Sequence, residues 1–248
     1  ARLLRQRTRL RSPDDAVDEP APAPAQEEAA PEPEPTAIPE PTEPVAQQFY
    51  TEEFDADTSL WTYFLVQGPP KAKDPIFVED DFGTMFVGTD GGRLAYNLES
   101  EGQWPYVTYD AYTYEDVRID VVAENRGVNN NNVSLICRYT PEEGWYEYSI
   151  ANSGLYWLFH GIVRDDGYVI YNQIGNGGSN KIKIGKETNE YTMVCQGKTL
   201  TLYVNGHETG SFDENNFALR EGQVGVGVAS FDVLPVKVEV ESITISEP

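Results

Sequence analysis

Basic residues are scarce in this chain of 248 residues. It has 18 Lys and Arg against 41 Asp and Glu, a formal net charge of -23 and an isoelectric point of about 4.3. Such a charge repels polyanions at long range, which argues against nucleic acid as a partner. Long apolar runs are missing too, since no stretch approaches the roughly 18 consecutive apolar residues of a membrane span. The sequence therefore predicts neither a nucleic-acid partner nor a membrane span within the chain.

Cysteine and histidine are too few for a zinc centre. The chain has two of each, Cys137, Cys195, His160 and His207, and no pair has the spacing of zinc ligands. A cysteine nucleophile is not indicated either, because both cysteines alternate with core residues in predicted strands. The sequence therefore predicts neither a zinc site nor a cysteine nucleophile.

Glycine and aromatic residues are absent from the segment 12–48. It holds ten of the 17 prolines and ten acidic residues. This composition cannot bury enough apolar surface to offset the entropy of ordering, and it favours an extended polyproline II conformation. We predict a disordered Pro/Glu/Ala-rich linker here, with a proline-motif ligand for another domain as the alternative.

Five arginines occur within residues 1–11, before this linker. Such a run is typical of the flank of a membrane segment or signal. A solvated basic end is the equally weighted alternative. A tether upstream of residue 1 is therefore one hypothesis.

Residues 49–248 contain all 21 glycines and all the aromatic residues of the chain. Apolar and polar residues alternate with a period of two, as in Val117, Ile119 and Val121, which indicates strands with one buried face. Asn205-Gly206 predicts a hairpin turn, and a change of parity near Glu241-Ser242 predicts a β-bulge. No long segment has helical spacing. We predict a dozen or more strands in one all-β domain over 49–248.

Six short motifs follow one another in this domain. In this order they resemble the concanavalin A-like lectin/glucanase superfamily, particularly its laminin-G-like and 3-keto-disaccharide hydrolase-like jelly rolls of bacterial surface proteins. The resemblance covers about residues 49–246 and implies a two-sheet antiparallel jelly-roll β-sandwich whose concave sheet often binds glycans. The motifs are Leu135–Tyr139, Gly144–Ile150, Gly154–Tyr156, Val194–Gly197, Leu200–Gly206 and Gly222–Gly225.

The resemblance also bears on the compartment and on the two cysteines. It implies an extracellular or cell-surface location, and we expect a monomeric domain. The resembling family tends to carry cysteine at both positions, so we expect a disulfide between Cys137 and Cys195, with two buried free thiols as the alternative.

Catalysis is not implied by the resemblance. The glucanases of this superfamily carry Glu-x-Asp-x-x-Glu on one strand, and no stretch here matches it. Glu239 and Glu241 share a strand face, but their alternation with valine is typical of a solvated face. We therefore expect a non-catalytic module that binds a glycan or surface polysaccharide. A glycoside hydrolase acting on disaccharides or glucans is one alternative, and a structural or protein-binding laminin-G-like module is another.

Aromatic side chains are the predicted sugar platform, because sugar rings stack their C–H faces on flat side chains. Filling a large sandwich core is the competing role for the same residues. Alternation places Trp145 with Glu147 on one strand face and Tyr146 with Tyr148 on the other; further along, it favours Leu155, Trp157 and Phe159 as core. The predicted stacking residues are Trp104, Trp145, Tyr146, Tyr148 and Tyr156, with Arg138 and Asn152 as hydrogen-bonding residues.

No cofactor is required by this hypothesis, although a structural calcium ion is an option. Calcium needs several oxygen ligands, and acidic or amide clusters occur at several points of the domain. Asp165 and Asp166 are the candidate metal ligands, but Asp-Gly sequences such as Asp166-Gly167 are turn formers first.

Overall fold

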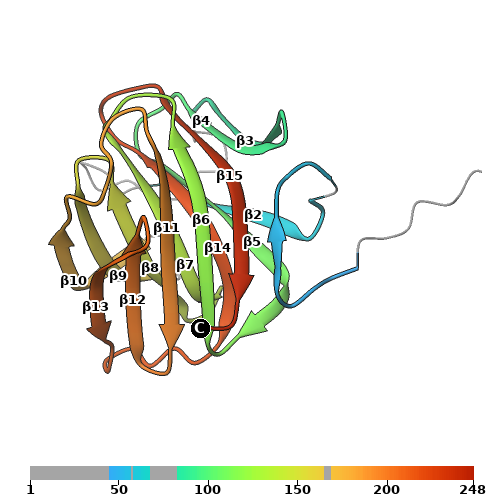
Figure 1. Ribbon diagram of the computed structural model, residues 1–248, viewed down its shortest axis with the longest axis vertical. Helices are drawn as coiled ribbons and strands as arrows, with labels where there is room; N and C mark the ends of the chain where they lie inside the picture. The colour runs from blue at the N-terminus through green and yellow to red at the C-terminus, as the bar shows by residue number, and fades with distance from the viewer. Residues whose placement is uncertain (1–44, 57, 68–82, 165–168) are drawn as a thin grey trace, which may run out of the picture. The chain divides into compact units, whose positions relative to one another are not determined.

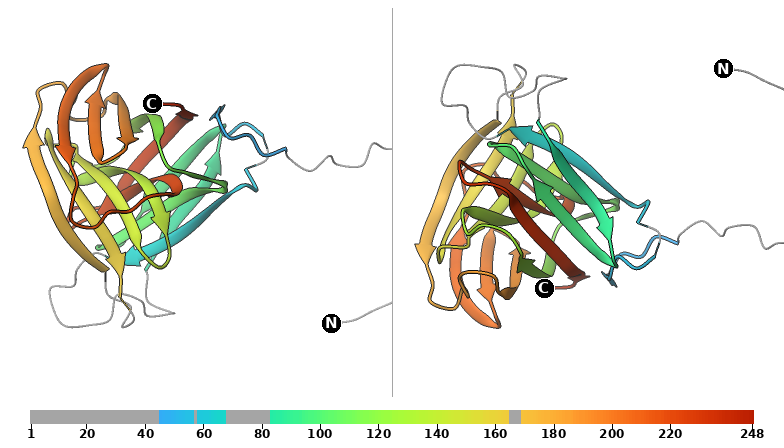
Figure 2. Two further views of the ribbon diagram at one scale, coloured as in Figure 1. Left: turned by 90° about the horizontal axis from the view of Figure 1, so that it is seen from below. Right: turned by 90° about the horizontal axis from the view of Figure 1, so that it is seen from above.

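Two antiparallel β-sheets, packed face to face, make up the described part of the chain (Figure 1). The computed structural model describes residues 45–56, 58–67, 83–164 and 169–248. Views from below and above show the same two layers (Figure 2). The predicted all-β jelly-roll sandwich is confirmed. The basic end and most of the predicted linker fall on residues 1–44, outside the described residues. Since the described residues form no helix, none of them provides a helical membrane span.

One sheet has seven strands, and its outer face carries the candidate site. The strand order is β10-β9-β8-β7-β14-β5-β2. Every neighbouring pair is antiparallel. The strands are β2 (Trp61–Gln67), β5 (Gln103–Tyr114), β7 (Asn131–Thr140), β8 (Gly144–Ala151), β9 (Leu155–Val163), β10 (Val169–Gly178) and β14 (Gly222–Ser230).

The second sheet has eight strands in the order β13-β12-β11-β6-β15-β4-β3, with β1 also paired to β15. It covers the inner face of the first sheet. The strands are β1 (Tyr50–Glu52), β3 (Met85–Asp90), β4 (Arg93–Leu98), β6 (Val117–Asn125), β11 (Thr188–Gln196), β12 (Thr199–Val204), β13 (His207–Asp213) and β15 (Val236–Ser246).

Local sequence signals explain how these strands turn and bend. Asn205 and Gly206 join β12 to β13 with φ angles of 51° and 77°, the left-handed conformation that a type I′ turn requires. In β15 the register against β6 shifts between Val240 and Ser242. This bulge keeps Val240 and Ile243 both buried, so the predicted hairpin and bulge are confirmed.

The core lies between the two sheets, and a disulfide crosses it. Cys137 of β7 is bonded to Cys195 of β11, 58 residues later, which confirms the expected pairing. Strand alternation turns Val117, Ile119 and Val121 of β6 inward, while Arg118 and Asp120 form an ion pair on the outside. The disulfide therefore ties the seven-stranded sheet to the eight-stranded sheet.

Residues just before β1 contact the domain through tyrosines of β5. The Tyr109 hydroxyl donates to the Gln47 carbonyl at 2.9 Å, and the Tyr114 hydroxyl donates to the Gln48 carbonyl at 2.7 Å. The Tyr112 hydroxyl reaches the Ala46 carbonyl at 3.4 Å. These bonds fix the end of the segment that leads into the domain.

Candidate functional site

Strand β8 alternates its side chains between the core and the outer face of the seven-stranded sheet. Tyr146 and Tyr148 belong to the core between the sheets. Trp145 and Glu147 face the other way, as predicted, and Trp145 packs in a separate apolar cluster on the outer face. The outer face of β8 therefore presents a carboxyl group beside an indole ring.

Glu147 is buried, with an exposed fraction of 3%, and accepts hydrogen bonds from three neutral side chains. Ser134 Oγ donates to Oε1 at 2.6 Å. Trp145 Nε1 and the Tyr106 hydroxyl donate to Oε2 at 2.9 and 2.8 Å. Since Tyr106 donates to the carboxyl, the Tyr171 hydroxyl, 2.9 Å away, donates to Tyr106. A chain of donors thus converges on one carboxyl group.

The environment of Glu147 opposes its ionisation. Burial raises the pKa of the Glu147 carboxyl, whereas the hydrogen bonds from Ser134, Trp145 and Tyr106 act to lower it. Burial also raises the pKa of Tyr106 and of Tyr171 well above the ordinary value, so both stay neutral donors. Among the described residues, no Lys, Arg or His forms an ion pair with Glu147.

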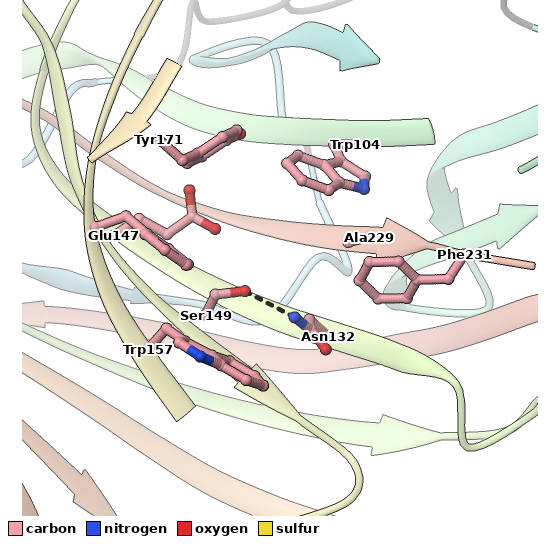
Figure 3. Close-up of a pocket in the computed structure, with 9 residues that line it drawn as sticks. Trp104, Asn132, Glu147, Ser149, Trp157, Tyr171, Ala229 and Phe231 are labelled. Carbon is pink, nitrogen blue, oxygen red and sulfur yellow. Dashed lines mark hydrogen bonds between the residues drawn. The ribbon is translucent and has the colours of Figure 1, made fainter. Parts of the chain in front are cut away.

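A cavity of about 340 Å³ lies beside Glu147 on this face (Figure 3). This volume is at the lower end of the range of about 300–1,000 Å³ for ligand pockets. Apart from the polar atoms of its aromatic residues, its polar lining groups are few: the Asn132 amide donates to Ser149 Oγ at 3.0 Å, and Glu147 is the third such residue. The lining residues are Trp104, Asn132, Glu147, Ser149, Trp157, Phe159, Tyr171, Ala229 and Phe231.

Aromatic rings form the walls of this cavity and meet edge to face. The Trp104 ring lies 5.0 Å from that of Tyr171, at an interplanar angle of 66°. The Phe159 ring lies 5.6 Å from that of Tyr171, and the Phe231 ring lies 6.3 Å from that of Trp104, both at 70°. Buried Nε1 of Trp104 is a donor without an acceptor among the described residues. The cavity therefore offers π-faces in several orientations and very few free polar groups.

Close backbone packing holds the aromatic layer beneath the cavity. A Cβ atom at Gly161 of β9 would lie 2.6 Å from the Trp145 indole. A Cβ atom at Gly227 of β14 would lie 2.5 Å from the Tyr106 ring. Glycine alternates with valine along β14, so one face of this strand has no side chain at Gly227. Tyr106, a donor to Glu147, can therefore pack directly against its backbone.

The structure brings only Trp104 and Trp145 of the predicted platform to this face. Trp104 lines the cavity, and Trp145 is buried beside it as a donor to Glu147. The other three predicted stacking residues lie on the inner face, where their hydroxyls bond within the protein. Tyr146 donates to Glu214, Tyr148 to the Leu200 carbonyl and Tyr156 to the Thr209 carbonyl. Their rings fill the core, which is the alternative that strand alternation left open.

Arg138 and Asn152, the predicted hydrogen-bonding residues, also lie away from the cavity. The Arg138 guanidinium donates to the carbonyls of Glu115 and Leu219 and pairs with Asp116 at 3.3 Å. The Asn152 side chain donates from Nδ2 to the Gly185 carbonyl and accepts at Oδ1 from the Gly185 N–H. Both side chains hold connections between strands, because a buried polar group needs partners and the nearest ones are loop carbonyls.

The structure reverses the predicted faces of β9. Trp157 and Phe159 were expected in the core, but they line the cavity, whereas Tyr156 and Leu158 belong to the core. Both faces of this strand carry aromatic residues, so alternation alone does not show which face is covered. Pairing supplies the missing information: Glu147 of β8 lies opposite Phe159 of β9, so the two share a face.

No metal centre is formed by the described residues, where no three His, Cys, Asp or Glu side chains converge. The candidate calcium ligands Asp165 and Asp166 lie outside the described residues. Glu239 and Glu241 lie on the eight-stranded sheet, where both pair with Arg93. They are therefore not neighbours of Glu147.

Comparison with known proteins finds similarity of fold. No family model matches the chain, and no curated protein is similar to it in sequence. A glycoside hydrolase family 16 endo-glucanase from Bacteroides ovatus has a TM-score of 0.55 and 12% identity over 79% of this chain and 99% of its own. The Bacillus licheniformis β-glucanase has a TM-score of 0.53 and 12% identity over 82% and 100%.

A Bacillus subtilis protein of unknown function with a galectin-like fold is similar to the same degree, with a TM-score of 0.54 and 8% identity over 80% of this chain and 94% of its own. At these identities the similarity concerns the fold alone. The chain has the concanavalin A-like jelly-roll fold that its sequence motifs predicted.

Proposed function

We propose that this protein is a carbohydrate- or surface-polymer-binding module that acts outside the cell and does not cleave its ligand. The observation that carries the proposal is the aromatic cavity on the outer face of the seven-stranded sheet. Trp157 and Phe159 offer faces for the C–H surfaces of a sugar, and a ligand hydroxyl oxygen would give the Trp104 N–H an acceptor. Display on the proline-rich segment of residues 12–48 is part of this proposal.

A binding role without hydrolysis is supported by the number of carboxyl groups. Glycoside hydrolysis uses two, about 5–5.5 Å apart in retaining enzymes and about 6.5–9.5 Å apart in inverting ones. Glu147 is the single carboxyl among the described residues that line the cavity. The outer face of β8 carries Trp145, Glu147 and Ser149, so Glu147 is the only carboxyl group on this face of the strand.

Hydrolysis is the second candidate, because a buried carboxyl with a raised pKa is suited to act as a general acid. The Glu147→Gln variant separates the two roles. If the protein is a hydrolase, this variant loses release of reducing ends from a glycan that the unmodified protein cleaves. If it is a binding module, neither protein releases any.

The direct test is binding of the full chain to a glycan and polysaccharide array, with calcium and again with chelator. We expect binding without cleavage, reduced about tenfold or more by Trp157→Ala, which corresponds to about 1.4 kcal/mol. Tyr63→Ala is the matched control, since Tyr63 is an exposed aromatic residue of β2 outside this cavity. Loss on chelation would support a calcium ion. Silence of the whole array would contradict the proposal.

A further inference from the structure

Glu147 is deeply buried, and none of the described residues gives it a cationic partner. An ionised carboxylate away from water is costly unless a charge of opposite sign compensates it. Its hydrogen-bond partners Ser134, Trp145 and Tyr106 are all neutral donors. Hydrogen bonds from neutral groups stabilise the negative charge but leave it uncompensated. A positively charged ligand in the adjoining cavity would compensate it.

The cavity walls provide a second source of attraction for a cation. The faces of aromatic rings are electronegative, and a cation within about 6 Å of a ring centroid is attracted, most strongly by Trp. Trp104, Tyr171, Phe231 and Phe159 meet at steep angles, and Trp157 adds another indole to the lining (Figure 3). A small ligand in this cavity therefore has several rings around it.

The polar groups of the cavity argue against a strongly hydrated guest at its floor. Asn132 and Ser149 bond to each other, and Glu147 is surrounded by donors. The one buried side-chain polar atom without a partner among the described residues is Trp104 Nε1, and a single ligand oxygen would satisfy its N–H. A ligand group with many hydroxyls or N–H groups would leave most of them unpaired against aromatic walls. A cation whose surface is made of C–H groups has no such need, and the net charge of -23 raises the concentration of cations near the protein.

We propose that the cavity beside Glu147 binds a compact alkylated ammonium group, with the carboxylate as its counter-charge and the rings of Trp104, Trp157, Phe159, Tyr171 and Phe231 as its walls. The inference rests on the proposed role of this cavity as a ligand site and names the chemical group that the site selects. A glycan or polymer recognised here would carry that group as a substituent.

The test compares two probes of almost equal shape by calorimetric titration of the full chain. Choline carries a trimethylammonium group, and 3,3-dimethylbutan-1-ol is its neutral carbon analogue. We expect choline to bind about tenfold or more tightly than the alcohol, in line with cation–π attraction plus a nearby charge. The four tryptophans, three of them on this face, provide a fluorescence signal for the same titration.

Substitutions then assign the preference to the site. Glu147→Gln should lower choline affinity about tenfold and leave the affinity of the alcohol unchanged, because it removes the charge and keeps the shape. Glu190→Gln removes the same charge from an exposed position of β11 and should change neither. Trp157→Leu should weaken choline binding even if Glu147→Gln proves unstable, and thermal melting checks that each variant is folded.

Equal affinity of the two probes, or no choline binding in the millimolar range, would overturn this inference. Glycan binding that neither choline nor Glu147→Gln affects would also overturn it and would leave the proposed function intact. Choline binding together with a silent glycan array would uphold the inference and contradict the proposed function. The two proposals therefore fail in distinguishable ways.

Discussion

Glu147 and Glu214 are two buried glutamates of the same domain, with exposed fractions of 3% and 5%. Glu147 lies on the outer face beside the cavity, where its partners are neutral side chains. Glu214 follows β13 and accepts hydrogen bonds from the Tyr146 hydroxyl and from the backbone N–H groups of Asn216, Phe217 and Ala218. Glu147 belongs to β8, and Glu214 contacts the residue before it, Tyr146, on the opposite face of the same strand.

The partners decide the charge state of each acid. Burial acts to raise the pKa of Glu214, but the Tyr146 hydroxyl and the loop N–H groups outweigh it, and the pKa is lowered. For Glu147 burial prevails, and the pKa is raised. Backbone donors fixed by a turn make Glu214 a structural carboxylate. Glu147 lies beside a cavity and has no charged partner among the described residues, which is why we propose it as the ligand-facing acid.

We expect the largest loss of stability from removing the disulfide between Cys137 and Cys195, which joins the two sheets. Replacing Cys137 and Cys195 together by serine should lower the free energy of unfolding by about 4 kcal/mol, because the bond closes a loop of 58 residues. Denaturant titration at several pH values measures it. The free energy of unfolding should fall by the same amount at every pH. A loss that varies with pH would mean that the disulfide influences the ionisation of Glu147 or Glu214.

Glu214→Gln should lower the free energy of unfolding by about 2–3 kcal/mol at pH 7, since the variant loses charge-assisted hydrogen bonds. A lowered pKa stabilises the folded state above the unfolded-state value, about 4.3, and this contribution disappears as the pH falls through the folded-state value. The difference between the variant and the unmodified protein should therefore shrink on acidification. A constant difference from pH 7 to pH 3 would contradict the assignment.

The tyrosine hydroxyls that bond the two acids provide a matched pair. Tyr146→Phe removes the donor to Glu214 and leaves the Leu219 N–H without its acceptor, so we expect a loss of about 1–3 kcal/mol. Tyr106→Phe removes one of three donors to Glu147, and we expect a loss of about 1 kcal/mol or less. Thermal melts of the two variants under the same conditions show which substitution costs more stability. A larger loss for Tyr106→Phe than for Tyr146→Phe would contradict this prediction.

Glu147→Gln should have the smallest effect at neutral pH, within about 1 kcal/mol, and the opposite pH trend. A raised pKa stabilises the folded state below the unfolded-state value, and this contribution is lost as the pH rises through the folded-state value. The variant should therefore gain stability relative to the unmodified protein between pH 4 and pH 8.

The groups around Glu147 do not disturb this trend. The titratable side chains that face it are Tyr106 from β5 and Tyr171 from β10, which remain neutral over this range, while β7 and β9 contribute Ser134 and Phe159. Urea titrations of both proteins at matched pH values measure the difference. A decline of the variant relative to the unmodified protein on going to higher pH would show that Glu147 is a structural carboxylate like Glu214.

The sequence by itself determined the features that depend on neighbours along the chain. Alternating valines predicted β6, Asn205-Gly206 predicted the hairpin, and the change of parity predicted the bulge in β15, because each signal is complete within a few residues. The ordered motifs carried the jelly-roll resemblance, and with it the pairing of Cys137 with Cys195. Local sequence also showed that Trp145 and Glu147 share a face.

Only the tertiary structure decided that Trp145 and Glu147 lie on the outer face of the seven-stranded sheet, and which residues surround them. Both faces of β8 and of β9 carry aromatic residues, so the covered face depends on where the second sheet packs. The partners of Glu147 are equally non-local: Ser134 and Tyr106 precede it by 13 and 41 residues and reach it from β7 and β5. The neutral donors and aromatic rings surround this carboxyl group, and form the candidate site, because strands distant in sequence are adjacent in the sheet.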